Sequence, residues 1–243
     1  MDGLTLPAHR VRISTRARHP RITVTPTDGV VVVVPRRFGV RGAERLAHEM
    51  LSEHRIWVLR QLRRMEHLPP VEVPPLPESV HLRCVDRELP VIYRTTDAAL
   101  RLRVDDGVVQ VKGRVEAAEP VFDLMRRWLT HEAKAVLPPR VELLSGEAGL
   151  RYGRVGVRGQ RTRWGSCSRR GDLSLNYKLL FLPSELVDYV IRHELAHTVH
   201  LNHSPHFWRL LERIAPDSER LDRAMREAGR FVPAWVEWRP PRA

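Results

Sequence analysis

Residues 183–208 read PSELVDYVIRHELAHTVHLNHSPHFW, and this stretch decides what kind of fold the chain has. A proline followed by Ser184 is a usual helix start, and the apolar residues after it recur at helical spacing to about Leu201. His193 and His197 stand four residues apart on the predicted helix. Four residues make close to one helical turn and rise about 6 Å, so both imidazoles project from one face. The pattern indicates a helix that holds a metal ion.

The residue types on this helix favour zinc. Zinc binds imidazole nitrogens readily, and a catalytic zinc uses three protein ligands while keeping one position for water. Glu194 follows the first histidine directly, so its carboxylate lies beside the same face. It is placed to act as general base toward a zinc-activated water without ligating the metal itself. We therefore expect Zn²⁺ as the cofactor, held in part by His193 and His197.

The third ligand has to come from chain that turns back toward the helix. Asn202 is a residue type that commonly ends helices, and Ser204-Pro205 fits the cap and first position of a new helix. His203 then lies in the turn between the two helices and is the expected third ligand. His206, in the first turn of the new helix, is the alternative, and His200 is expected on the helix surface.

A second informative segment, residues 161–168, reads RTRWGSCS. Arg163 is a candidate for holding a substrate carboxylate or phosphate, or for stabilising an oxyanion, with Trp164 beside it. The alternative is structural: the indole packs under the sheet and the guanidinium pairs with a carboxylate of the fold. Cys167 is not expected to be a nucleophile, because the histidines that could activate its thiol are expected to bind the metal.

The first 67 residues predict a small α+β unit. An amphipathic helix is expected from Gly42 to about Met65, and Thr27-Asp28-Gly29 fits a hairpin turn between the last two strands. The three strands expected here are Val11–Ile13, Ile22–Val24 and Val30–Val34. Residues 68–79 contain five prolines and predict an extended connector.

Residues 80–243 predict a second, larger domain. A long helix is expected from Glu119 to Val136, ended by Pro138 and Pro139, and residues 160–170 read as a loop. The strands expected in this domain are His81–Val85, Pro90–Arg94, Leu100–Val104, Val108–Lys112, Tyr152–Arg158 and Leu173–Asn176.

Composition sets limits on location and partners. The chain has 42% hydrophobic residues, enough for a sizeable core, and no apolar run long enough for a membrane span or a signal peptide. Its two cysteines are far apart, which favours a reducing compartment, and we expect a cytoplasmic protein. The net charge of +12 comes almost entirely from Arg, which makes a nucleotide, a nucleic acid or an acidic peptide a candidate partner. The alternative is a well-solvated surface from an Arg-rich composition.

Several short motifs together resemble a known family. They are, in chain order, Arg163-Trp164-Gly165-Ser166-Cys167-Ser168, Leu175-Asn176, Asp188-Tyr189-Val190, His193-Glu194-Leu195-Ala196-His197, Asn202-His203-Ser204 and Phe207-Trp208. This series closely resembles the YgjP-like metal-dependent hydrolases, relatives of the SprT-like and WLM zinc peptidases in the zincin clan. The resemblance is strongest from about Gly153 to Ile214 and extends more loosely over the N-terminal strands and helix.

The resemblance implies an α+β fold. In it, a zincin-like catalytic domain has its active-site helix packed on a small, mostly antiparallel sheet, and an N-terminal α+β unit is added. It implies that zinc is held by the two helix histidines and His203. It also places the strand Leu173–Asn176 beside the cleft, where in related peptidases an extended substrate pairs with such a strand. Asn176 therefore joins Arg163 and Trp164 as a candidate substrate-binding residue.

These observations predict a zinc-dependent hydrolase, in the first place a metallopeptidase that uses Glu194 as general base. The first alternative keeps the metal and changes the substrate to a nucleoside triphosphate, since family members have been labelled as UTP pyrophosphatases as well as peptidases. The alternative from another class is a basic nucleic-acid-binding protein with a structural zinc.

Overall fold

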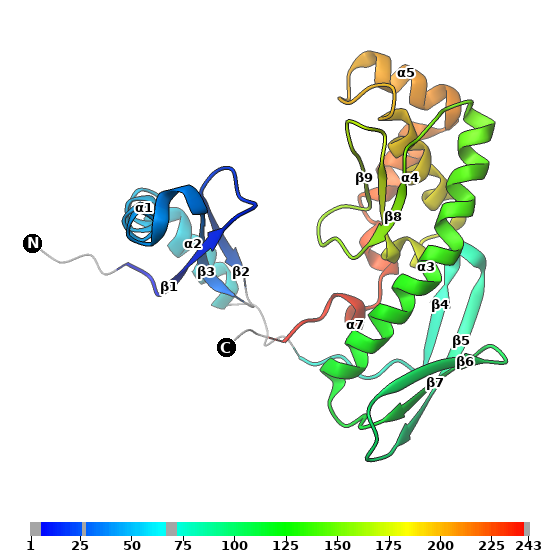
Figure 1. Cartoon of the computed structure of the whole chain (residues 1–243), viewed down its shortest axis with the longest axis horizontal. Coiled ribbons are helices and arrows are strands. Elements are labelled where there is room, and N and C mark those ends of the chain that lie inside the picture. Colours follow the sequence, from blue (N-terminus) through cyan, green and yellow to red (C-terminus); the bar gives the residue numbers. More distant parts are fainter. Residues whose placement is uncertain (1–5, 26–27, 67–71, 241–243) are drawn as a thin grey trace, which may run out of the picture. The chain divides into compact units, whose positions relative to one another are not determined.

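The fold is described from a computed structural model, in which residues 6–25, 28–66 and 72–240 are placed well enough to describe. The chain divides into two compact units, Met1–Glu72 with Arg239–Ala243, and Val73–Trp238. Each unit has a hydrophobic core of its own (Figure 1). Residues 68–71 of the expected connector lie outside the described residues, and the expected boundaries at residues 67 and 80 stay a prediction.

The N-terminal unit is a three-stranded sheet packed against two helices. Its elements are β1 (His9–Ser14), β2 (Arg21–Thr25), β3 (Gly29–Pro35), the 3-10 helix η1 (Arg36–Phe38), α1 (Gly39–Glu53) and α2 (Arg55–Glu66). The central strand β3 is parallel to β1 and antiparallel to β2. Alternate residues of a strand face one side, so Val30, Val32 and Val34 share a core with Ala47 and Leu51 of α1.

The single helix expected from Gly42 to about Met65 is two helices. His54 separates them with φ −99° and ψ 17°, while the N–H of Val58 still donates to its carbonyl (3.0 Å). Leu51 and Val58, on either side of the break, are both fully buried. Ile56 and Leu59 after the break are exposed, so the apolar spacing that predicts one helix does not follow the buried face through it. Thr27 of the expected hairpin turn lies outside the described residues.

The larger unit begins with a four-stranded sheet. Its strands are β4 (Ser79–Leu82), β5 (Arg87–Thr95), β6 (Arg101–Asp105) and β7 (Val108–Gly113), in the order β4-β5-β7-β6. β5 and β7 are parallel, and the other two pairs are antiparallel. Asp106 and Gly107 both have positive φ and form the two-residue turn that was expected. The strand expected over His81–Val85 ends at Leu82, because Arg83–Val85 form the 3-10 helix η2.

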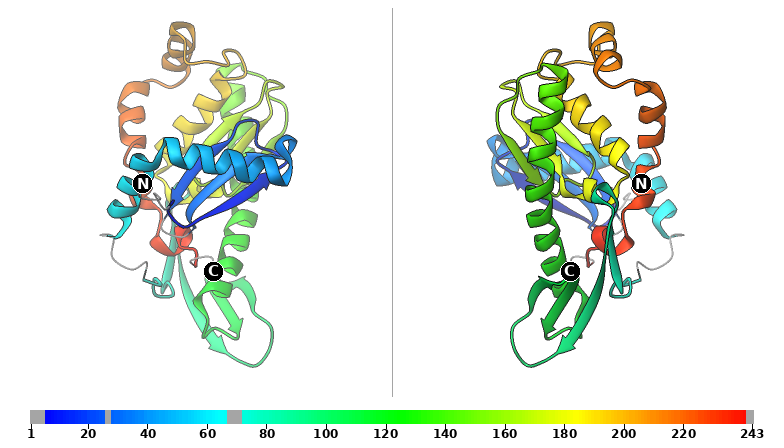
Figure 2. Two further views of the ribbon diagram at one scale, coloured as in Figure 1. Left: turned by 90° about the vertical axis from the view of Figure 1, so that its left-hand side faces the viewer. Right: turned by 90° about the vertical axis from the view of Figure 1, so that its right-hand side faces the viewer.

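The long helix α3 (Ala118–Ala148) continues through the two prolines that were expected to end it. Each proline removes a helical hydrogen bond and costs about 3 kcal/mol or more inside a helix. Burial on both sides of the prolines offsets this cost, because Leu137, directly before them, and Val141 and Leu144, beyond them, are buried in the core at about 1.5–3 kcal/mol each. α3 thereby runs from the four-stranded sheet to the second sheet of this unit (Figures 1 and 2).

The second sheet lies next to the metal-binding helix predicted from sequence. It consists of β8 (Val155–Arg158), β9 (Gly165–Cys167) and β10 (Leu173–Asn176), in the order β8-β10-β9, and the 3-10 helix η3 (Tyr177–Phe181) follows. β10 is parallel to β8 and antiparallel to β9. β9 lies inside the segment 160–170, which the sequence predicts to be a loop. Three polar or small residues carry no strand pattern, and only pairing with β10 makes them a strand.

Helices make up the rest of the unit. They are α4 (Ser184–Ala196), α5 (Pro205–Ile214), α6 (Ser218–Met225), the 3-10 helix η4 (Ala228–Phe231) and α7 (Ala234–Glu237). α4 was expected to reach about Leu201 but ends at Ala196. The N–H groups of Thr198 and Val199 donate to carbonyls three residues back, which tightens the last turn.

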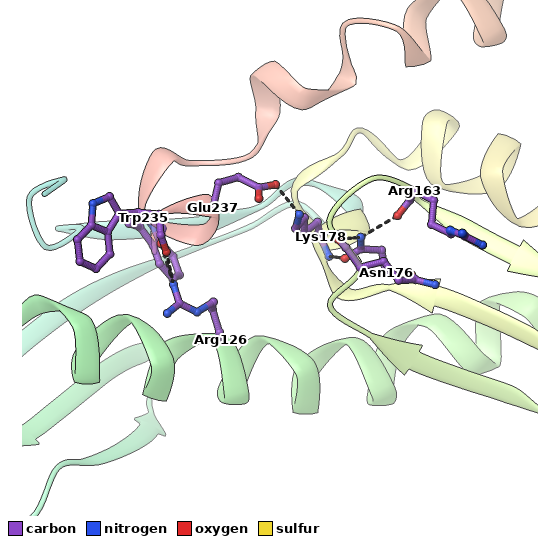
Figure 3. Close-up of polar contacts among 8 residues, drawn as sticks. Arg126, Arg163, Asn176, Lys178, Trp235 and Glu237 are labelled. Atoms are coloured by element: carbon purple, nitrogen blue, oxygen red, sulfur yellow. Dashed lines mark hydrogen bonds and ion pairs between the residues drawn. The ribbon is translucent and has the colours of Figure 1, made fainter. Parts of the chain in front are cut away.

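The C-terminal segment 234–238 belongs to the core of this unit. The rings of Trp235 and Trp238 lie 5.9 Å and 5.7 Å from the ring of Phe122 on α3. The buried guanidinium of Arg126 donates to the carbonyl of Trp235 at 3.1 Å (Figure 3). It also donates to the carbonyl of Trp238 at 3.2 Å. No helix in the described part of the chain combines the length and the apolar character needed to cross a membrane.

Candidate metal centre

The first two histidines meet because the chain keeps its helical course to the end of α4. His197 is the residue that follows the helix, and its φ of −68° and ψ of −15° continue the turn. Its N–H donates to the carbonyl of His193 at 3.3 Å. The two imidazole ring centres are therefore only 4.9 Å apart, on one face, as the spacing predicts.

His203 joins them from the turn before α5. Ser204 caps that helix, its hydroxyl accepting from the N–H of Phe207 at 3.4 Å, and Pro205 is the first helical residue. The His203 ring centre lies 5.1 Å from that of His193 and 4.7 Å from that of His197. One ring nitrogen from each of the three histidines lies within 4.8 Å of the others.

The aromatic ring of Phe207 packs against all three histidines of this cluster. Its ring is fully buried and lies 5.0 Å, 4.5 Å and 4.8 Å from the rings of His193, His197 and His203. Packing against one rigid ring restricts how far each imidazole can rotate. The cluster is thus held in place before any ion binds.

The other two histidines of this region lie outside the cluster. His206 is exposed, and its Nδ1 accepts from the guanidinium of Arg209 at 2.8 Å. His200 lies past the end of α4, where its carbonyl accepts from Nδ1 of His197 at 2.9 Å. Its predicted place on the helix surface was wrong, because the helix ends four residues earlier.

The electrostatics keep two of the three imidazoles neutral. Burial lowers the pKa of His193 to about 4, and the nearby His197 and His203 act in the same direction. Burial likewise lowers the pKa of His197, although its hydrogen bond to the carbonyl of His200 acts in the opposite direction. Neutral imidazole is the form that binds metal. The lone pair of His193 therefore stays available well below neutral pH, and burial acts in the same direction on His197.

Glu194 lies on the buried side of the cluster. The side chain is 6% exposed, and its Oε2 has no hydrogen-bond partner among the described residues. Burial raises the pKa of this carboxyl to about 7, and the positive charge of Arg163 acts in the opposite direction. A carboxyl with a pKa near neutrality can both accept and return a proton at physiological pH.

Gly165 on β9 lies directly against this carboxyl group. A Cβ at that position would come within 2.7 Å of both Cγ and Oε1 of Glu194. Only glycine leaves room for the strand at this distance. The sequence motif around Trp164-Gly165 gave a signal for this residue, but its role depends on a contact across 29 positions of the chain and was missed.

Asn176 fixes the loop that leads into β9. It is 2% exposed, and its amide donates to the carbonyls of Gln160 (2.8 Å) and Arg163 (2.9 Å), as Figure 3 shows. Its Oδ1 accepts from the N–H of Lys178 at 3.2 Å. All the polar atoms of this side chain are thus used inside the protein. Its predicted contact with substrate stays a prediction.

The remaining candidates of the loop differ in exposure. Arg163 is exposed and close enough to Glu194 to influence its pKa. Trp164 is partly buried and packs against the core of the unit. The pKa of Cys167 is raised to about 11 by burial, with the charges of Glu194 and Asp172 adding to the effect, so its sulfur is a thiol at neutral pH.

The cluster fits a tetrahedral metal ion. Nε2 of His193 and Nε2 of His203 are 3.1 Å apart. Two nitrogens at 2.0–2.1 Å from one tetrahedral zinc are separated by about 3.3 Å. Because Nδ1 of His197 donates to a carbonyl, the lone pair of this imidazole is on Nε2, the nitrogen left for the ion. Three imidazole nitrogens suit zinc better than calcium or magnesium, which prefer oxygen ligands.

Comparison with known proteins identifies the family. The YgjP-like metallopeptidase domain matches residues 18–228, which is most of the chain. The chain belongs to the YgjP-like family. It is accordingly a metal-dependent hydrolase of the peptidase type by family, and the match ends before the C-terminal segment 234–238.

Solved structures give weaker likenesses to this YgjP-like chain. It is 27% identical to the zymogen of abylysin, a metallopeptidase of Pyrococcus abyssi, with a TM-score of 0.34 over 38% of this chain and 94% of that one. It is 19% identical to the zymogen of jannalysin, a metallopeptidase of Methanocaldococcus jannaschii, with a TM-score of 0.32 over 36% and 90%. No curated protein matches the chain.

Proposed function

We propose that this YgjP-like chain is a zinc-dependent peptidase with His193, His197 and His203 as metal ligands and Glu194 as general base. The observation that carries the proposal is the convergence of the three imidazoles next to Glu194, whose carboxyl group is buried and whose Oε2 has no hydrogen-bond partner among the described residues. A bound zinc ion supplies Lewis acidity, which lowers the pKa of a coordinated water and polarises the scissile carbonyl.

Glu194 is the group that moves the proton. Its carboxylate takes a proton from the attacking water and passes it to the amine nitrogen as the peptide bond breaks. The pKa of about 7 in the metal-free chain is high enough for the carboxyl group to hold that proton between the two steps. Because residue 165 is glycine, no side chain of β9 lies between the strand and this carboxyl group, and the burial of the group excludes bulk water.

The topology supports β9 as the strand that pairs with a peptide substrate. The resemblance pointed to the strand Leu173–Asn176, but β10 has β8 on one side and β9 on the other, so both of its edges are occupied. β9 is an edge strand of this sheet, and its Gly165 touches the proposed base. An extended peptide added to β9 would place its backbone beside Glu194. Arg163, exposed just before β9, is then in reach of a substrate carboxylate.

The test measures metal and activity together. The protein is loaded with zinc, its metal content is measured by mass spectrometry, and a peptide library and a panel of nucleoside triphosphates are assayed side by side. We expect one zinc per chain, peptide cleavage, and loss of that cleavage in Glu194→Gln with the zinc retained. Release of pyrophosphate from UTP without peptide cleavage would replace the peptidase by the nucleotide hydrolase. Full biological function in Glu194→Gln would favour a structural zinc.

We further propose a cytoplasmic location for the protein. Its support is that Cys84 and Cys167 are both free thiols, as is usual in a reducing compartment. Fractionation of cells that express the native chain tests this.

A further inference from the structure

The positive charge of the protein is concentrated in the N-terminal unit. Residues 1–66 contain 13 Arg, no Lys and 6 Asp or Glu, a net charge of +7. The remaining 177 residues carry the other +5 of the total of +12. About a quarter of the chain thus holds more than half of the net charge. An Arg-rich composition spread evenly over the protein would not give this distribution.

The fold gathers six exposed arginines at one end of the three-stranded sheet, which we call the basic end. They are Arg12, Arg16, Arg18, Arg21, Arg36 and Arg37. Arg12 of β1 and Arg21 of β2 are both in register with Val33, one on each side of β3. The crossover between these strands carries Arg16 and Arg18. Two residues after Val33, β3 ends at Pro35, and Arg36 and Arg37 follow at once.

The basic end is held in a defined shape. The hydroxyl of Ser14 accepts from the N–H groups of Arg16 (3.3 Å) and Ala17 (3.2 Å), which orders the crossover where it leaves β1. The guanidinium of Arg37 lies 5.0 Å from the centre of the Phe38 ring. These contacts order the crossover and one guanidinium, and they bring no negative charge to the arginines.

The arginines of the basic end keep their positive charge in the described structure. Within the described part of the chain, none of the six arginines forms an ion pair. Asp28, the one acidic residue between positions 3 and 43, pairs with Arg10 at the opposite end of β3. α1 also starts at the basic end and has no acidic residue in its first turn but contains Arg41 there. The N-terminus of a helix favours negative charge, so an arginine at this point is unfavourable unless an anion binds nearby.

We propose that the basic end binds the phosphodiester backbone of a duplex nucleic acid. Arg donates paired hydrogen bonds to phosphate, and a bound polyanion removes the mutual repulsion of the clustered charges. Arg12 and Arg21 are two strand spacings apart, about 10 Å, close to the width of about 12 Å of the major groove. They are therefore spaced to reach phosphates on the two sides of one groove.

Two features favour a duplex over other polyanions. Binding to single strands relies on several exposed aromatic rings that stack on successive bases. Near the basic end the ring of Phe38 lies against Arg37, and Trp57, 44% exposed, is a single ring that lines a hollow with Arg21. Binding to membrane surfaces usually uses one amphipathic helix, whereas these arginines come from two strands, a crossover and a 3-10 helix.

The experiment uses the full chain and a fluorescein-labelled 20-base-pair DNA of random sequence. Binding is followed by fluorescence anisotropy from 50 to 200 mM KCl. With six phosphate contacts, the logarithm of the affinity should fall against the logarithm of salt with a slope of about −5. Arg16→Gln/Arg18→Gln should make the slope less steep by about 2 and weaken binding about tenfold. Arg36→Gln/Arg37→Gln, outside the crossover, should act in the same way.

The matched control is Arg101→Gln/Arg103→Gln, which removes the same charge from exposed positions on β6. It should leave affinity and slope nearly unchanged. Equal losses in the control would show a mere net-charge effect and overturn the proposal. So would wild-type binding by both variants of the basic end, tighter binding to the matching single strand, or displacement of the duplex by vesicles of anionic phospholipid. Circular dichroism melting of each variant checks the fold.

Discussion

Glu194→Gln should stabilise the metal-free protein at alkaline pH and not at acid pH. The carboxyl group is 6% exposed, and its pKa is about 7 instead of the ordinary 4.5. Between these two values the folded chain keeps a proton that the unfolded chain releases, so the free energy of unfolding falls as the pH rises. Each pKa unit corresponds to about 1.36 kcal/mol, and the full difference to about 3 kcal/mol.

The measurement is urea unfolding in the presence of a chelator, at pH 5 and at pH 8.5. The stability of the glutamine variant relative to wild type should rise by about 2–3 kcal/mol between these two pH values. The cost of burying the new amide does not depend on pH and cancels in the comparison, as do the histidines common to both proteins. Glu142→Gln, an exposed position on α3, is the matched control and should give a constant difference. A constant difference for Glu194→Gln as well would refute the account of its burial.

Three more predictions concern the same site. His203→Ala should lose the bound zinc, while His206→Ala keeps one equivalent. The zinc content is measured by mass spectrometry after dialysis against a chelator. The reverse result would make His206 the third ligand in place of His203. Gly165→Ala should lower kcat/KM for a peptide at least about tenfold, because the new methyl group would lie 2.7 Å from the carboxyl group of the proposed base. Gly156→Ala is the control and should keep activity, because the atom nearest to its new methyl group would be 3.9 Å away. Equal activity in both glycine variants would mean that β9 shifts freely. Asn176→Leu should lower the free energy of unfolding by about 2–4 kcal/mol, because three backbone groups lose their partner; urea unfolding at the wild-type value would show that water replaces the amide.

Local signals explain what the sequence predicts well. The spacing of His193 and His197 is a property of one helical turn, and Ser204-Pro205 is a local start signal for the next helix. The α+β class and the YgjP-like resemblance rest on the same short-range patterns, and both are confirmed. The choice of His203 rests on the turn that Asn202 and Ser204-Pro205 predict, and its ring does lie beside the other two, while its role as a ligand stays a prediction.

Long-range contacts explain what the sequence reading missed. Pro138 and Pro139 would end an isolated helix, but burial of the residues beyond them against α4 and the second sheet keeps α3 intact. β9 has no strand pattern of its own and exists through its pairing with β10. The closeness of Gly165 to Glu194 likewise depends on how the sheet packs on α4, which no local pattern records.

The tryptophans of the C-terminal segment 234–238 have a practical consequence for any shortened form of this chain. The match to relatives stops at residue 228, yet Trp235 and Trp238 cover Phe122 in the hydrophobic interior. Two tryptophan side chains bury about 400 Å² of surface. This burial contributes about 10 kcal/mol to the free energy of folding before the loss of conformational entropy is subtracted. That contribution is comparable to the net stability of a typical domain. A polypeptide cut where the similarity stops would therefore aggregate rather than fold.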